Sequence, residues 1–122
     1  MRIRELEVND ARGYRALRLR ALKEHPTAFS TSYEQQRDWP LGTFGEQLRT
    51  SFDSPDAFIL GCFVDGSLIG TAGLLREEGP KRMHRAVIWG KHVAADHQGK
   101  GYGRALPVAA LDRARQIPGL AL

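Results

Sequence analysis

A glycine-rich turn between an apolar strand and a helix constrains this chain more than any other feature. Glycines stand at positions 99, 101 and 103, after an expected strand that ends at Val93 and before a helix that runs to about Ile117. Glycine lets the backbone adopt unusual angles and approach a ligand closely. The unpaired N–H groups and the positive dipole end at the start of a helix favour a phosphate. The turn therefore predicts a phosphate-binding site, its alternative being a simple connection between strand and helix.

Two well-known phosphate motifs are excluded by the spacing. A Walker motif needs Ser or Thr after its Gly-Lys pair, and here Lys100 is followed by Gly101. A dinucleotide-binding turn needs the spacing G-x-G-x-x-G, whereas these glycines are spaced G-x-G-x-G.

The segments before the turn alternate between strand and helix patterns. Asp65-Gly66 is typical of a type I′ hairpin turn, here between expected strands Ala57–Val64 and Ser67–Leu75. In a further strand, Arg85–Val93, simple alternation places Trp89 and Val93 on one face. The other expected elements are a strand over Arg2–Val8, a helix capped by Asn9 or Asp10 that stops before His25-Pro26, and a helix over Thr43–Phe52 capped by Thr43. This order, β-α-α-β-β-β-α, predicts an α/β fold with a mainly antiparallel sheet flanked by helices.

The string from Val93 to Arg104 resembles the acyl-coenzyme A motif of the GNAT superfamily of N-acetyltransferases. That motif reads Q/R-x-x-G-x-G/A after Val-x-Pro at the end of the fourth strand. Gln98, Gly101 and Gly103 fill its defining positions, and Ala95 replaces the proline. The resemblance implies a GNAT-like fold, one incomplete acetyltransferase domain over residues 1–122, and acetyl-CoA as co-substrate. The residues it assigns to CoA are Val93, Ala94, Ala95, Gln98, Gly99, Lys100, Gly101, Tyr102, Gly103 and Arg104.

The activity implied by this resemblance is transfer of an acetyl group from acetyl-CoA to a primary amine of a small molecule or peptide. The amine would attack directly in a ternary complex, with the pantetheine arm beside the fourth strand, where family members carry a bulge. Backbone groups near His92, Val93 and Ala95 would pair with that arm. The alternative is a CoA-binding module without turnover, because the chain is short.

The attacking amine must be neutral, so the reaction needs a base or a chain of waters. His92 is nearest in sequence to the thioester position, and imidazole titrates in the useful range. The other candidates are Glu77, Glu78 and His84.

The charge of the chain is concentrated around this region. Residues 81–104 hold six Lys or Arg and one acid, while the whole chain has a net charge of +4. A local basic segment suits a polyanionic small ligand at least as well as nucleic acid. Because no aromatic side chains interleave the basic residues as a stacking platform, a nucleic-acid partner is not expected.

Composition excludes several other classes of protein. A single cysteine, Cys62, rules out an internal disulfide framework and a cysteine-based zinc site, and no metal is expected. The longest uncharged apolar stretch, Ala57–Val64, is too short to cross a membrane. The N-terminus has no apolar signal segment. We therefore expect a soluble cytoplasmic protein without a membrane partner.

The chain departs from the family pattern after the last helix. It stops at Leu120-Ala121-Leu122, where a fifth strand should begin, and the family's later tyrosine acid has no counterpart. Ile88, Trp89 and the apolar face of the last helix are then expected to lack a cover. An open strand edge invites pairing, so we expect a homodimer or a longer polypeptide. Pro107 is expected to delay or kink the last helix.

Overall fold

The Asp65-Gly66 dipeptide makes the turn that the sequence predicts, with φ angles of 52° and 80°. It joins β2 (Ala57–Val64) to β3 (Ser67–Arg76), which pair antiparallel. The computed structural model describes residues 1–24, 33–77 and 85–120. Over these residues β1 (Arg2–Glu5) pairs with β2 and β4 (Ala86–Val93) pairs with β3, so the antiparallel sheet has the order β1-β2-β3-β4. The predicted α/β fold is confirmed.

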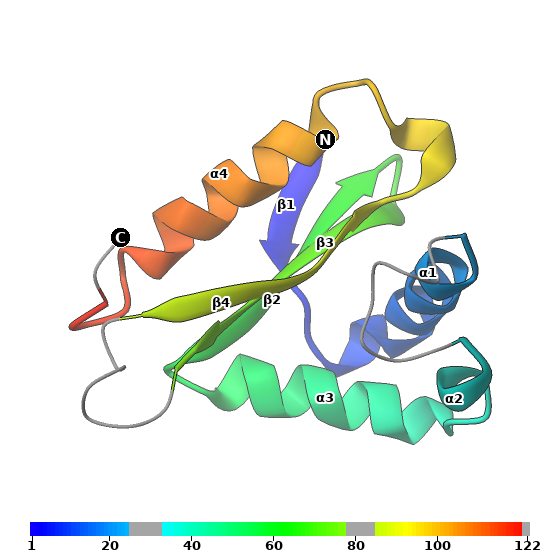
Figure 1. The fold of residues 1–122 in the computed structure, drawn as a ribbon, viewed down its shortest axis with the longest axis horizontal. Coiled ribbons are helices and arrows are strands. Elements are labelled where there is room, and N and C mark those ends of the chain that lie inside the picture. The colour runs from blue at the N-terminus through cyan, green and yellow to red at the C-terminus, as the bar shows by residue number, and fades with distance from the viewer. Residues whose placement is uncertain (25–32, 78–84, 121–122) are drawn as a thin grey trace.

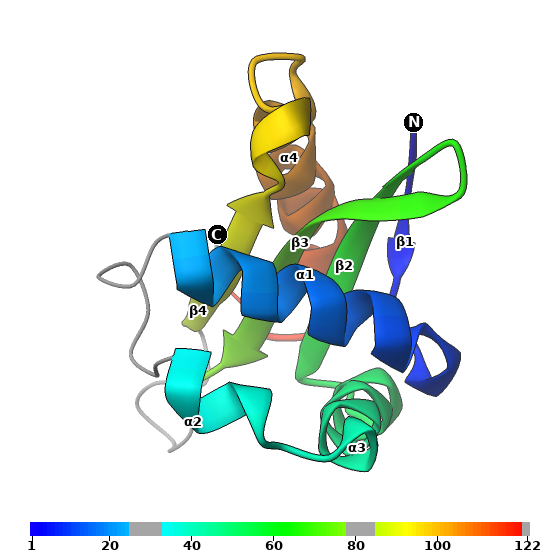
Figure 2. The same ribbon diagram turned by 90° about the vertical axis from the view of Figure 1, so that its right-hand side faces the viewer.

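Helices cover both faces of this sheet (Figure 1). The helices of the described residues are α1 (Ala11–Glu24), α2 (Tyr33–Arg37), α3 (Leu41–Asp53) and α4 (Tyr102–Ala114), with 3₁₀ turns η1 (Val8–Asp10) and η2 (Ala95–His97). α1 and α3 lie on one face and α4 lies on the other, as the rotated view in Figure 2 also shows. Residues on opposite faces of β4 therefore meet different partners.

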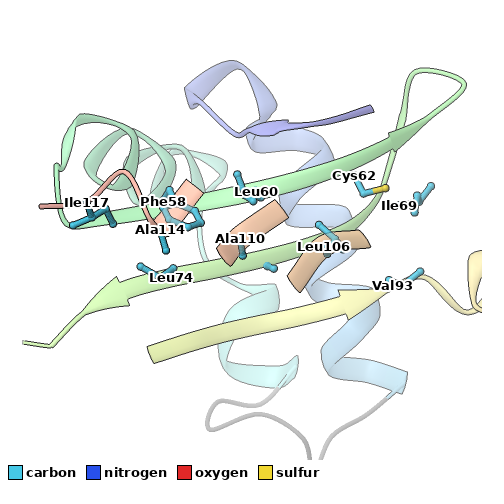
Figure 3. Close-up of a cluster of buried hydrophobic side chains, with 11 residues drawn as sticks. Phe58, Leu60, Cys62, Ile69, Leu74, Val93, Leu106, Ala110, Ala114 and Ile117 are labelled. Atoms are coloured by element: carbon cyan, nitrogen blue, oxygen red, sulfur yellow. The ribbon is translucent and has the colours of Figure 1, made fainter. Parts of the chain in front are cut away.

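Two apolar clusters hold the layers together, and β2 contributes to both. Phe58, Leu60 and Cys62 face α4, while Ile59 faces α1 and α3. The cluster under α4 (Figure 3) consists of Phe58, Leu60, Cys62, Ile69, Ala72, Leu74, Val93, Leu106, Ala110, Ala114 and Ile117. The cluster under α1 and α3 consists of Leu6, Ala11, Tyr14, Phe44, Leu48 and Ile59. β2 is apolar on both faces because both faces are covered.

The first strand is shorter than the predicted Arg2–Val8 because a local hydrogen-bond box ends it. The Asp10 carboxylate accepts the backbone N–H of Glu7 at 2.9 Å and pairs with both terminal nitrogens of Arg4 at 2.8 Å. Asp10 thus caps η1 and does not cap α1, which corrects the sequence prediction. α1 extends to Glu24, and the predicted stop at His25-Pro26 lies outside the described residues.

The segment between α1 and β2 contains more helix than the sequence predicts. α3 begins at Leu41 after Pro40, so Thr43 is not its cap. The sequence analysis did not predict the short helix α2. Contacts with α1 hold this helix in place. Arg15 donates to the carbonyl of Arg37 at 3.1 Å, so the position of α2 depends on the docked α1.

A bulge in β4 overturns the predicted faces of this strand. In register, Trp89 lies opposite Gly73 and His92 opposite Thr71, so two residues of β4 face one residue of β3. Gly90 has a φ of 61°, a conformation that favours glycine. The extra residue reverses the alternation. Trp89 consequently packs against the cluster under α1 and α3, whereas Val93 belongs to the cluster under α4.

α4 begins at Tyr102 and continues through Pro107 to Ala114, slightly short of the predicted end near Ile117. Of the two outcomes expected of Pro107, a delayed or a kinked helix, the delay is therefore wrong, and the kink stays a prediction. Because proline has no N–H, the Gly103 carbonyl has no donor from this position. Leu120 lies outside any strand, and residues 121–122 of the expected fifth strand lie outside the described residues.

β4 is an edge strand of the described sheet, and apolar side chains are exposed beside it. Leu75, Val87 and Ile88 are 53%, 48% and 43% exposed. The expectation that Ile88 lacks a cover is confirmed. Trp89 is half-buried, and Leu106 and Ala110 on α4 are buried, so for them the expectation is wrong.

Candidate functional site

The glycine-rich turn lies between η2 and the start of α4. Gly99 has a φ of 79°, and Gly101, the residue before the first helical residue, has a φ of 90°. Both angles lie in the left-handed region that favours glycine. Tyr102 and Gly103 open the helix, where N–H groups have no intrahelical acceptor. The turn therefore presents backbone donors at the positive end of the α4 dipole.

Gly103 is a glycine that neither conformation nor packing explains. Its φ is not positive, and a Cβ atom at this position would meet no described heavy atom within 4 Å. Glycine within a helix costs roughly 0.5–1 kcal/mol relative to alanine. The space beside Gly103 is open, which lets a ligand approach the backbone of the first helical turn.

Hydrogen bonds of the loop itself hold the turn against β4. The side-chain amide of Gln98 donates to the carbonyl of Val93 at 2.9 Å. The Ala94 N–H donates to the carbonyl of Ile69 at 2.8 Å, so this donor is used inside the protein. Gln98 and Ala94 therefore shape the turn. The carbonyl of Ala95 likewise accepts a backbone N–H within η2.

The electrostatics of the turn favour an anion. Lys100 and Arg104 are exposed at the turn. Asp96, the acid of the loop, pairs with Arg20 of α1 at 3.1 Å. A hydrogen bond from its own backbone and the Arg20 guanidinium hold the pKa of Asp96 below its ordinary value. The charge of Asp96 is thus offset by α1, and the two cations face solvent beside the free backbone donors.

A second group of polar residues meets at the β4 bulge, on the α1 side. A Cβ atom on Gly90 would lie 3.5 Å from Nη1 of Arg18, so this guanidinium lies over the bulge. Nε of Arg18 donates to Oε1 of Gln36 at 3.4 Å, and Gln36 is 3% exposed. From β3, the Thr71 hydroxyl donates to the Gly90 carbonyl at 3.0 Å. The sheet and two helices therefore converge on one point of β4.

The same group includes a buried tyrosine. Tyr14 of α1 is buried, and its burial raises the pKa of the phenol, while the positive charge of Arg18 opposes that rise.

The structure separates the candidate bases. His92 is buried and lies opposite Thr71, next to the bulge. Glu77 lies at the other end of β4, where its N–H donates to the Arg85 carbonyl at 3.0 Å. Seven residues of extended chain separate Arg85 from His92, roughly 20 Å. Glu77 is therefore not brought together with His92, and Glu78 and His84 lie outside the described residues.

Cys62 is fully buried in the cluster under α4. Burial raises the pKa of its thiol, which disfavours the reactive thiolate. Its position is that of a small core residue.

Two hollows lie away from the turn. A groove of about 900 Å³ lies between α3 and the sheet, lined by Glu46, Gln47, Leu75 and Trp89 among others. A smaller hollow of about 530 Å³ lies between α1, the β2–β3 turn and η2, and Asp96 contributes to its wall. Neither hollow is lined by Gly101–Gly103, so the turn lies on the exposed surface.

Among the residues that the structure describes, no group of three or more His, Cys, Asp or Glu side chains is placed to hold a metal ion. In the same ranges, every helix is too short or too polar to cross a membrane.

The sequence analysis did not single out Arg18, and it did not predict that the bulge at Gly90 lies next to α1. A glycine inside a strand pattern signals a bulge, so Gly90 carried a usable signal. Arg18 carried none, because it is one of several basic residues in α1 and only the docked helix selects it.

A family model described as the acetyltransferase (GNAT) family matches residues 15–122. A GNAT acetyltransferase from Streptococcus pneumoniae has a similar structure, with a TM-score of 0.86, 19% identity, and coverage of 98% of this chain and 70% of that one. The PaiA N-acetyltransferase from Thermoplasma acidophilum, solved in complex with coenzyme A, has a TM-score of 0.73 and 19% identity over 95% of this chain and 74% of its own.

A ribosomal-protein-alanine N-acetyltransferase from Brucella melitensis biovar Abortus 2308 has a TM-score of 0.64 and 24% identity, covering 96% of this chain and 74% of its own. A search of curated proteins found no match. The structural likenesses show the fold, and the family model covers most of the sequence. The chain therefore belongs to the GNAT acetyltransferase family.

Proposed function

We propose that this protein binds acetyl-CoA at the turn from Gly99 to Arg104 and transfers the acetyl group to a primary amine. The observation that carries the proposal is the start of α4, where free backbone donors, open space at Gly103 and two exposed cations coincide. Phosphate groups bind well at such a helix N-terminus. The coenzyme A complex of a structural neighbour supports this class of ligand.

The bulge at Gly90 gives this site its second part. A bulge interrupts the regular ladder of strand hydrogen bonds, and here it lies a few residues before the turn along β4. The pantetheine arm would run from the turn along β4 to this point. A backbone N–H at the bulge would donate to the thioester oxygen as negative charge develops there.

The reaction is direct attack by the amine on the thioester carbonyl carbon. The new C–N bond forms, the C–S bond breaks, the nitrogen loses a proton and the CoA thiolate takes one up. His92 is our candidate for the proton acceptor, because it is the described histidine next to the bulge and imidazole titrates near neutral pH.

The test is release of free thiol from acetyl-CoA in the presence of primary amines. The panel includes small amines and, because one neighbour is a ribosomal-protein-alanine N-acetyltransferase, a peptide with an N-terminal alanine. We expect amine-dependent thiol release and a loss of about 100-fold or more in kcat for His92→Gln, the usual range for a general base. CoA binding by calorimetry without thiol release from any amine would favour the alternative, a CoA-binding module without turnover. Absence of CoA binding would overturn both.

A further inference from the structure

We infer that the backbone N–H of Lys91 donates to the acetyl carbonyl of bound acetyl-CoA, and that the Thr71 hydroxyl holds this N–H in position. The inference rests on the proposed function, because it names the backbone donor of the same site and the side chain that orients it. Thr71 is thus a positioning residue, since it acts through the peptide between Gly90 and Lys91.

The hydrogen bond of Thr71 is the first argument. The register places two residues of β4, Gly90 and Lys91, opposite Ala72 of β3, and Thr71 precedes Ala72. The Thr71 hydroxyl donates to the Gly90 carbonyl at 3.0 Å, and Thr71 is only 7% exposed. A bulge disrupts the ladder of strand hydrogen bonds locally. Here a buried side chain supplies a donor to the backbone of the bulge.

The planarity of the peptide group is the second argument. The Gly90 carbonyl and the Lys91 N–H belong to one trans peptide, in which the two groups point in opposite directions. Because the carbonyl points toward the Thr71 hydroxyl, the N–H points away from it. β4 is an edge strand of the described sheet, and Lys91 is exposed. Lys91 is therefore accessible to a ligand that lies along β4.

The conformational freedom of Gly90 is the third argument. Its φ of 61° lies in the left-handed region, and glycine resists rotation of the backbone less than other residues do. The Thr71 bond limits this rotation at the carbonyl. When the amine attacks the thioester, negative charge develops on the carbonyl oxygen, and a donor that is oriented beforehand stabilises this charge without reorganisation.

Stabilisation of the bulge alone is the competing explanation for the Thr71 hydroxyl. Loss of a merely structural bond would lower stability and would change the binding of CoA and acetyl-CoA alike. A role in orienting the Lys91 N–H affects the acetyl carbonyl selectively, and CoA lacks this carbonyl. The distinguishing measurements are therefore kcat against CoA affinity, and the state of the bound carbonyl.

The kinetic experiment compares Thr71→Val with Thr71→Ser in the thiol-release assay. Thr71→Val should lower kcat about ten-fold, less than the roughly 100- to 1,000-fold for loss of an oxyanion donor, because the N–H itself remains. Its CoA affinity by calorimetry should stay near that of the wild type, and Thr71→Ser, which keeps a hydroxyl, should restore most of kcat. Ser67→Ala removes a hydroxyl from the exposed start of β3 and should leave kcat unchanged. A drop in CoA affinity that matches the drop in kcat would overturn the inference.

Infrared spectroscopy of acetyl-CoA labelled with ¹³C at its carbonyl separates this inference from the proposed function. A hydrogen bond lowers the stretching frequency of a carbonyl, so binding should lower it in the wild type and lower it less in Thr71→Val. No lowering in the wild type, or an equal lowering in Thr71→Val, would overturn the inference even if acetyl transfer occurs. A lowering that depends on Thr71, with thiol release from no amine, would overturn the transfer activity and keep the carbonyl donor.

A backbone ester at Lys91 tests the donor directly and does not depend on the folding of Thr71→Val. The ester replaces the Lys91 N–H by oxygen and leaves the Thr71 side chain intact. It should lower kcat roughly 100- to 1,000-fold and abolish the change in carbonyl frequency. Wild-type kcat and carbonyl frequency in this variant would overturn the inference.

Discussion

Glycine residues serve different physical purposes at single positions of this fold. Gly99 and Gly101 adopt positive φ angles, whereas Gly73 leaves space for the ring of Trp89, since a Cβ there would come within 3 Å of it. Gly103 fits neither explanation, and Gly90 combines a positive φ with the approach of Arg18. Gly103, the position with the least internal justification, lies at the proposed CoA site.

For Gly103 we predict that substitution by alanine raises the stability of the protein and weakens its binding of CoA. Gly103→Ala should raise the free energy of unfolding by about 0.5–1 kcal/mol, because alanine is the better helix former and the space is open. The same variant should weaken the binding of CoA, because its side chain adds bulk where the phosphate approaches. Gly103→Asp should abolish CoA binding, because it adds negative charge as well as bulk. Urea unfolding and calorimetry measure the two effects. Wild-type CoA affinity in Gly103→Asp would contradict the site.

Lys100 tests whether the turn selects phosphate. Lys100→Ala should weaken the binding of CoA by about 0.5–2 kcal/mol, the scale of a partly exposed charged hydrogen bond. Pantetheine, which lacks the pyrophosphate, should bind much more weakly than CoA to the wild type and equally to both proteins. Calorimetry with both ligands checks this, and equal affinities for CoA and pantetheine would argue against phosphate recognition.

Among the elements, α4 combines the proposed CoA-binding surface with a proline inside the helix. Its buried side, from Leu106 to Ala114, packs on the sheet, while its first turn faces the proposed ligand. Pro107 removes one hydrogen bond from the helix between these two parts. Packing against the sheet evidently compensates for a residue that the local sequence disfavours.

Pro107→Ala should restore a donor for the Gly103 carbonyl and stabilise the protein by about 1–3 kcal/mol. Thermal and urea unfolding measure this, with Val108→Ala on the exposed side of α4 as the control that should change little. A loss of stability in Pro107→Ala would show that the proline ring contributes packing that outweighs the hydrogen bond.

The hydrogen-bond box of Arg4, Glu7 and Asp10, just before α1, predicts how stability depends on pH. The hydrogen bond with Arg4, and after it the Glu7 N–H, hold the pKa of Asp10 below its ordinary value. A depressed carboxyl pKa stabilises the folded state above the unfolded pKa of about 4, and this contribution disappears as the pH falls through the lower folded pKa. Asp10→Asn should therefore destabilise the protein at pH 7 by about 1–3 kcal/mol and flatten the acid limb of its stability curve.

Asp112→Asn provides the matched control for Asp10, because the Asp112–Arg115 pair is exposed. It should shift the free energy of unfolding by less than about 0.5 kcal/mol at any pH. Urea unfolding between pH 2.5 and 7 checks both variants. An Asp10→Asn curve parallel to that of the wild type would contradict the assignment.

At the scale of the whole molecule, the sheet separates the two parts of the proposed site. The turn proposed to bind phosphate lies at the start of α4, and the α1 face carries His92 next to the bulge of β4. β4 is an edge strand of the described sheet, and Leu75, Val87 and Ile88 are exposed beside it. An apolar strand edge of this kind favours association.

We accordingly expect this chain to self-associate through β4. Light scattering over a range of concentrations should show species larger than 13.6 kDa, and Ile88→Lys should shift the population toward the monomer, since a lysine opposes edge pairing. Val108→Lys, an exposed apolar position on α4, is the control that should leave association unchanged. A wild-type chain that stays monomeric at all concentrations would contradict this expectation.

The local pattern of the sequence alone determined the hairpin and the glycine-rich turn, because each depends on the conformational limits of a few adjacent residues. Asp65-Gly66 adopts positive φ angles, and so do Gly99 and Gly101 at the turn. The tertiary structure decided the faces of β4, the partner of Asp10 and the position of Arg18. These depend on a register shift against β3, on an arginine six residues away and on the docking of α1 over Gly90. Periodicity cannot encode such contacts, because they arise only when separate segments pack together.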